Sequence, residues 1–189
     1  GYDIAIHCIG DKAVELVLKV FIKLRELGYN NILRIEHSQL VKPDDIVKYS
    51  KYNIVASVQP IHFTSDYEMA LKRLGQERLQ NIGYPWKSFL KNNVKVIAGS
   101  DFPIESENIL LGINSFVTRE PDVNNKNEKI NLDEALQCYT TTPNKLINYD
   151  YKYLEINELA NFNIIKNFDI DNLKNSTVRK VFFEGIELL

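Results

Sequence analysis

Short apolar runs alternate with amphipathic stretches along the first three quarters of the chain. Short apolar runs bounded by turn-forming residues are typical of buried strands, and apolar residues at helical spacing indicate helices packed on a core. We expect strands at residues 4–6, 32–36, 54–58 and 94–98. We expect helices at about residues 14–24, 43–52, 86–90, 109–117 and 132–141, and another that ends near Leu79. Strands joined by helical crossovers predict an α/β fold with a parallel sheet.

The pattern changes after Pro143. The runs Asn163–Ile165 and Val178–Glu184 stand among turn-forming Asn and Asp residues and predict β-structure, with a hairpin turn at residues 183–187. We therefore divide the chain into an α/β region, 1–148, and a small β region, 149–189. The stretch Asp122–Asn131 is rich in Asn and Lys, and we expect it to be a mobile surface loop.

The composition narrows the class of protein. With 189 residues, 44% of them hydrophobic and 25% charged, the chain is an ordinary soluble globular protein. The net charge of −2 is spread along the chain without a basic stripe, which argues against a nucleic-acid partner. No apolar run has the roughly 18 residues that a membrane span needs, which argues against a membrane protein.

The two cysteines, Cys8 and Cys138, lack CxxC spacing. We expect both to be buried free thiols in a reducing compartment, and so a cytoplasmic protein. The chain begins without an initiator Met or a signal-peptide pattern. Residues 1–6 look like the start of a strand cut from a longer chain.

Candidate chemistry lies where the predicted strands end. Of the three histidines, His7 and His37 follow predicted strands, and a third strand runs into Gly99-Ser100-Asp101. In a β/α barrel the carboxyl ends of the strands converge on one face, so these side chains would meet. Two imidazoles and a carboxylate are a normal ligand set for Zn²⁺, which lowers the pKa of a bound water from 15.7 to about 7. A nearby carboxylate can accept that water's proton and pass it to a leaving group.

Position alone leaves a structural interpretation open for the same residues. A histidine at a strand end is commonly a hydrogen-bonded core or loop residue, and an aspartate after Gly-Ser commonly caps a turn or helix. Asp11 lies at a helix start and is expected to be an N-cap. Glu36 should point to the side of its strand opposite His37, where we expect a structural ion pair.

Four segments, in order, resemble the amidohydrolase superfamily, in the branch called amidohydrolase family 3. They are His7-Cys8-Ile9-Gly10-Asp11-Lys12-Ala13, Arg34-Ile35-Glu36-His37-Ser38-Gln39, Ser57-Val58-Gln59-Pro60 with His62, and Gly99-Ser100-Asp101-Phe102-Pro103. They are similar to that branch's His-Ala-Ile-Gly-Asp-Arg-Ala, Arg-Ile-Glu-His-Ala-Gln, Ser-x-Gln-Pro-x-His and Gly-Ser-Asp-x-Pro. The resemblance as a whole covers about residues 1–146.

The resemblance implies a fold and a set of roles. The strands would be strands five to eight of a TIM-type (β/α)8 barrel, its C-terminal half, followed by part of a small β-sandwich. His7, His37 and Asp101 would bind a divalent metal, most simply one or two Zn²⁺ ions. Asp101 would also be the general base and acid, and His62 could face the substrate or be a polar loop residue. The reaction implied is hydrolysis of a non-peptide C–N bond, of amide or N-substituted formamide type, in a small molecule.

The chain also departs from that family. Its members carry a His-x-His pair on the first barrel strand, and no His-x-His occurs here. We therefore expect these residues alone to be inactive, and to self-associate through open barrel edges. Near the C-terminus, Leu159-Ala160-Asn161 keeps only a trace of the family's Gly-x-x-Ala-Asp segment. Two alternatives stay open: a non-catalytic binding or regulatory protein that retains the fold, and an α/β domain with structural histidines.

Overall fold

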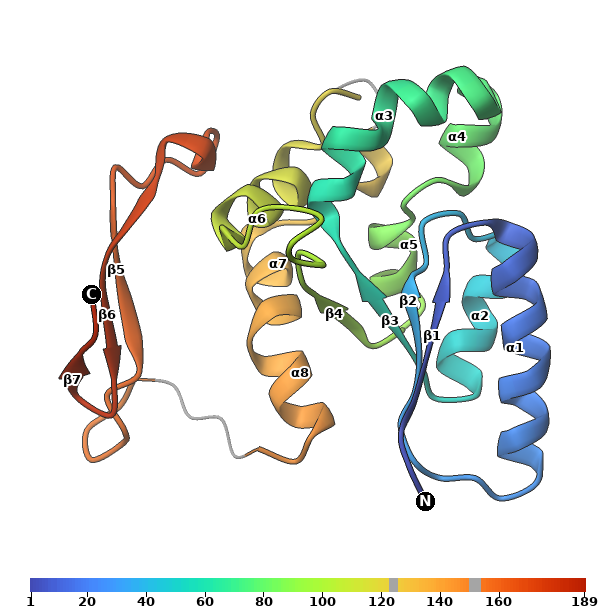
Figure 1. Cartoon of the computed structure of the whole chain (residues 1–189), viewed down its shortest axis with the longest axis horizontal. Helices are drawn as coiled ribbons and strands as arrows, with labels where there is room; N and C mark the ends of the chain where they lie inside the picture. The colour runs from blue at the N-terminus through green and yellow to red at the C-terminus, as the bar shows by residue number, and fades with distance from the viewer. Residues whose placement is uncertain (123–125, 150–153) are drawn as a thin grey trace.

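A four-stranded parallel sheet forms the centre of the molecule (Figure 1). The computed structural model describes residues 1–122, 126–149 and 154–189. The strands lie in chain order: β1 (Ile4–Cys8), β2 (Leu33–His37), β3 (Ile54–Val58) and β4 (Val96–Ala98). All three pairings are parallel. The predicted α/β fold is confirmed, and the predicted strands lie within a few residues of those observed.

Helices connect the strands and cover one face of the sheet (Figure 1). They are α1 (Asp11–Glu26), α2 (Pro43–Lys51), α3 (Pro60–Leu74), α4 (Gln76–Ile82), α5 (Trp86–Lys91), α6 (Ile109–Thr118), α7 (Leu132–Tyr139) and α8 (Thr141–Leu146). On β2, Leu33 and Ile35 are fully buried, whereas Arg34 and Glu36, which alternate with them along the strand, are only half-buried. Successive side chains of a strand point to opposite faces, so the helices cover the Leu33 face and leave the Arg34 face more open.

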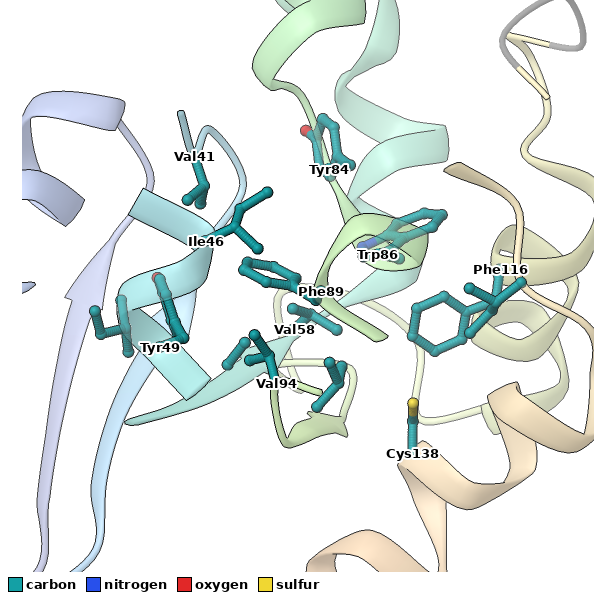
Figure 2. Close-up of a cluster of buried hydrophobic side chains, with 14 of the residues drawn as sticks. Val41, Ile46, Tyr49, Val58, Tyr84, Trp86, Phe89, Val94, Phe116 and Cys138 are labelled. Atoms are coloured by element: carbon teal, nitrogen blue, oxygen red, sulfur yellow. The ribbon is translucent and has the colours of Figure 1, made fainter. Parts of the chain in front are cut away.

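The core continues from the sheet into an aromatic cluster between β3, α5 and α6 (Figure 2). Trp86 packs edge-on against Phe116 at a centroid distance of 4.9 Å, and Phe63 packs edge-on against Tyr84 at 5.0 Å. Burying one such side chain contributes roughly 1.5–3 kcal/mol. Cys8 and Cys138 are buried free thiols in the same core, as predicted.

A three-stranded antiparallel sheet follows, with β5 (Phe162–Lys166), β6 (Thr177–Phe183) and β7 (Ile186–Glu187) in that order. The predicted β-structure and hairpin turn are therefore present. The short 3-10 helix Leu173–Asn175 packs against α6, and Leu173 is buried in the main core. This small sheet lies beside α6 and is joined to the rest by that contact (Figure 1).

Two features of the first region differ from the prediction. The helix that was expected to end near Leu79 is divided into α3, which begins at Pro60, two residues after the end of β3, and α4. A proline is favourable in a first helical turn because it has no N–H to leave unsatisfied there. The helix ends at Gly75, whose φ of 77° is accessible to glycine, and α4 starts at the next residue.

The described part of the segment Asp122–Asn131 is anchored, although a mobile loop was predicted. Residues 123–125 lie outside the described residues. Asp122 and Ile130 are buried, and Glu128 accepts hydrogen bonds from the backbone N–H and the hydroxyl of Ser88. The polar composition concealed these contacts, because a half-buried carboxylate can accept hydrogen bonds from protein donors in place of water.

Strands β1 and β4 are the edges of the sheet within the residues that the structure describes. Each leaves a row of backbone N–H and C=O groups without a ladder partner, which favours pairing with another chain. We predict that these 189 residues, expressed alone, elute as oligomers in size-exclusion chromatography with light scattering. A charge on the open face of the edge strand, Ala5→Lys, should reduce the apparent mass. A monodisperse monomer for the unmodified chain would contradict the prediction.

Among the described residues, no helix combines the length and the apolar character needed to cross a membrane.

Candidate active site

All three histidines form one cluster at the carboxyl ends of β1, β2 and β3. The His7 and His37 rings make an edge-on contact at a centroid distance of 4.5 Å, with 72° between their planes. On its other side His37 stacks against His62, at 5.7 Å and 14°. His7 is exposed, whereas His37 and His62 are buried. The structure thus brings together residues separated by 55 positions, because adjacent parallel strands end at the same edge.

The backbone at the end of β2 turns His37 toward this cluster. His37 has a φ of 71° and Ser38 a φ of 45°, so two successive non-glycine residues adopt the left-handed conformation. That conformation costs an L-residue roughly 1–2 kcal/mol. Ser38 is held there by hydrogen bonds: its N–H donates to Cys8 O, and its hydroxyl lies 2.9 Å from that of Tyr49.

Gln59 fixes the orientation and the tautomer of His37. The Gln59 Nε2 group donates to the carbonyl of Ser57, so its Oε1 faces the ring and accepts from His37 Nδ1 at 2.8 Å. The proton of neutral His37 therefore resides on Nδ1, and Nε2 carries a free lone pair. Gln59 stands immediately before α3, and its side chain bonds the histidine and does not cap the helix.

Burial lowers the pKa of His37 below its usual value, and the neighbouring His7 adds to that shift. The hydrogen bond to Gln59 and the charge of Asp101 act in the opposite direction. Since the lowering effects prevail, His37 is neutral near neutral pH. A neutral imidazole is the form that binds metal ions.

His62 has a different partner. It lies in the first turn of α3, where its Nδ1 is 3.2 Å from Nε2 of Gln39, the residue that follows Ser38. Its own Nε2 is buried and has no hydrogen-bond partner within the described ranges of the chain. A buried imidazole nitrogen without a partner is unfavourable unless some other group supplies one.

Asp101 lies at the end of β4 in a turn, with a φ of 58° and an exposed side chain. It is close enough to His37 to raise that histidine's pKa. Within the described residues, however, no group of three or more His, Cys, Asp or Glu side chains is arranged to hold a metal ion.

The donor chemistry of the two histidines fits a divalent metal. His37 is neutral, its Nδ1–H is hydrogen-bonded to Gln59, and the lone pair of its Nε2 is available for a metal ion. A metal-ligating histidine usually has such a hydrogen bond at its other ring nitrogen. His7 lies in contact with His37 and is exposed. The chemistry of His7 and His37 is thus compatible with a pair of metal ligands. Asp101, the third residue of the predicted set, does not form a group of potential ligands with them among the described residues.

A buried arginine supports the loops beneath the cluster. Arg119, at the end of α6, donates to the carbonyls of Gly83 and Tyr84 at 3.0 and 3.1 Å. Its guanidinium lies 4.4 Å from the ring centre of Phe63, the neighbour of His62 in the chain. Tyr84 N–H donates to the carbonyl of Gln39, so Arg119 is linked to the loop that carries Gln39.

Of two further predictions from the sequence, one is confirmed and one is wrong. Glu36 forms the expected ion pair, with Arg34 Nε at 2.7 Å. Asp11 is not the N-cap of α1: that residue is Gly10, and Asp11, the first helical residue, pairs instead with Arg78 at 3.0 Å. Gln39, Gln59 and Arg119 were not predicted as contributors. The signal for the two glutamines was their place in two of the segments that resemble the family, at the ends of β2 and β3.

Comparison with known proteins identifies the relatives of this chain. The model of the amidohydrolase family matches residues 1–186. The chain is 32% identical over 173 residues to Protein LONG AFTER FAR-RED 3 of Arabidopsis thaliana, covering 87% of this chain and 30% of that protein. It is 31% identical over 139 residues to Putative amidohydrolase YtcJ of Bacillus subtilis (strain 168), covering 74% and 26%.

A solved structure shows the same arrangement. It is that of an uncharacterized metal-dependent hydrolase from Pyrococcus furiosus, with a TM-score of 0.67 and 30% sequence identity, over 79% of this chain and 30% of that one. This chain therefore spans less than a third of each of the three proteins compared.

Proposed function

Because this chain belongs to the amidohydrolase family, we propose that it carries part of the active site of a metal-dependent hydrolase that cleaves a non-peptide C–N bond. The substrate is a small molecule with an amide or N-substituted formamide group. The observation that carries the proposal is the contact of His7 with His37, whose tautomer Gln59 fixes in the form that binds metal.

The same proposal covers the architecture. The four parallel strands are strands five to eight of a (β/α)8 barrel, the C-terminal half, and residues 149–189 are part of a small β-sandwich. The more open face of the sheet would then face the barrel interior. On that face His7, Glu36, Ser57 and Ile97 lie at one level across the four strands.

Each residue of the site has a role in the proposed reaction. His7, His37 and Asp101 would hold one or two divalent ions, most simply Zn²⁺. The ion would lower the pKa of a water molecule, so that it attacks at neutral pH. Asp101 would accept the proton of that water and deliver it to the leaving nitrogen, which departs poorly as an anion. His62 would contact the substrate from α3.

The test is metal analysis of the full-length gene product, followed by assay of a panel of N-formyl and N-acyl compounds. We expect about one or two equivalents of a divalent metal, and hydrolysis that a chelator removes and Zn²⁺ restores. A metal-free protein that is inactive on the panel would instead favour the alternative, a non-catalytic binding protein. The partners that His37 and His62 already have in Gln59 and Gln39 are compatible with that alternative.

We predict that Gln59→Leu weakens metal binding about 10- to 100-fold, because loss of the hydrogen bond to a ligand histidine frees its orientation and tautomer. Affinity would be measured by competition with a chromophoric chelator. Gln137→Leu, at an exposed position on α7, is the matched control and should bind as the unmodified protein does. Unchanged affinity in Gln59→Leu would show that Gln59 has no part in the metal site.

A further inference from the structure

His37 and His62 stack in nearly parallel planes, yet each is bonded at Nδ1 to a different end of a glutamine amide. His37 Nδ1 faces the carbonyl oxygen of Gln59. His62 Nδ1 faces the amino group of Gln39. An amide oxygen only accepts hydrogen bonds and an amide NH₂ only donates them, so the two contacts require opposite states of the two ring nitrogens.

The state of His62 follows from its contact with Gln39. Nδ1 accepts from the Gln39 amide, so the proton of the neutral ring resides on Nε2. That Nε2–H is buried and has no acceptor among the described residues. His62 as a whole is 6% exposed, and a substrate oxygen placed against Nε2 would supply the bond that those residues do not.

We propose that Gln39 is a positioning residue, which holds His62 as the Nε2–H tautomer so that it donates a hydrogen bond to a carbonyl or carboxylate oxygen of the substrate. The second half of this inference rests on the proposed function, since it takes His62 to face the substrate. The first half concerns the protein alone. It assigns adjacent imidazoles to opposite tasks: His37 offers a lone pair and His62 offers a proton donor.

Gln39 is itself well placed for this task. It is 6% exposed, and its backbone carbonyl accepts from Tyr84 N–H, a bond that ties its loop to the segment held by Arg119. The next residue, Leu40, forms an isolated antiparallel bridge with Gly83. The Gln39 backbone is thus fixed on both sides, which leaves its side chain little freedom to turn away from His62.

The direct test is ¹⁵N NMR of the imidazole rings near pH 8, above the usual histidine pKa of about 6.5. In the unmodified protein His62 should show a protonated Nε2 and an unprotonated Nδ1, the reverse of His37. Gln39→Glu should move the proton to Nδ1 of His62, because a carboxylate only accepts. Gln39→Leu should give a mixture of tautomers, and the exposed control Gln80→Leu should leave the spectrum unchanged.

A protonated Nδ1 on neutral His62 in the unmodified protein would overturn the inference, even if no Gln39 variant folds. The substrate half is tested with N-methylformamide, whose carbonyl should shift the His62 Nε2–H proton signal in the unmodified protein and not in Gln39→Glu. If the tautomer is as proposed but the signal does not move, the substrate half is wrong. Neither result depends on metal content or turnover, so failure of the proposed function would be seen separately.

Discussion

Asp101→Asn should lower kcat/KM about a thousandfold in the full-length gene product. A carboxylate that moves a proton in the reaction contributes about 10²–10⁴-fold, and the amide of asparagine cannot accept that proton. The substitution suits the backbone, because Asp101 has a φ of 58° and asparagine tolerates the left-handed conformation. Rates would be measured on whichever N-formyl or N-acyl compound proves to be a substrate.

Two controls separate the cause of that loss. Asp133→Asn, an exposed position in the first turn of α7, should leave the rate unchanged. Metal content of Asp101→Asn then distinguishes lost proton transfer, with the metal retained, from a lost ligand, with the metal reduced. Full activity in Asp101→Asn would contradict the proposed mechanism.

Arg119→Met should destabilise the fold by about 3 kcal/mol or more. The guanidinium is fully buried, donates to two backbone carbonyls and lies over the rings of both Phe63 and Trp86. Methionine would leave the buried Gly83 carbonyl without this donor, which costs about 1–3 kcal/mol, whereas the Tyr84 carbonyl keeps its bond from Trp86 N–H. Loss of the cation–π contacts with the two buried rings adds to this cost. Burial lowers the pKa of Arg119 to about 10, so the group is still charged at neutral pH.

The free energy of unfolding would be obtained from urea denaturation followed by Trp86 fluorescence. Arg73→Met, at an exposed position near the end of α3, should change it by less than about 0.5 kcal/mol. Arg119→Lys should fall between the two, since lysine keeps the charge but not the planar fork that reaches two carbonyls. Equal stability of Arg119→Met and the unmodified protein would show that the contacts contribute nothing net.

The order of the strands could be predicted from the sequence because each apolar run is short and is followed by an amphipathic helix. The meeting of His7 and His37 follows from that order, since both stand at the ends of neighbouring parallel strands. The start of α3 could not be predicted in the same way. Its first turns mix Ile61 and Phe63 with polar residues, and the proline that begins it is equally compatible with a loop.

The parts of the site that depend on exact three-dimensional contacts could not be predicted from the sequence. Neither glutamine carries charge or periodicity that would mark it, and the tautomer of a histidine depends on which end of an amide it meets. Arg119 was concealed for a different reason. Arginine is rarely buried, so an arginine at a helix end is expected to lie in solvent.

The left-handed backbone of His37 and Ser38 affects which substitutions evolution would favour at these two positions. A position that strains an L-residue is released by mutation to glycine, and the left-handed conformation is then adopted without penalty. A lineage that kept only the shape of the sheet would gain stability by that change. A histidine retained at such a position is what selection for the proposed chemistry would leave behind.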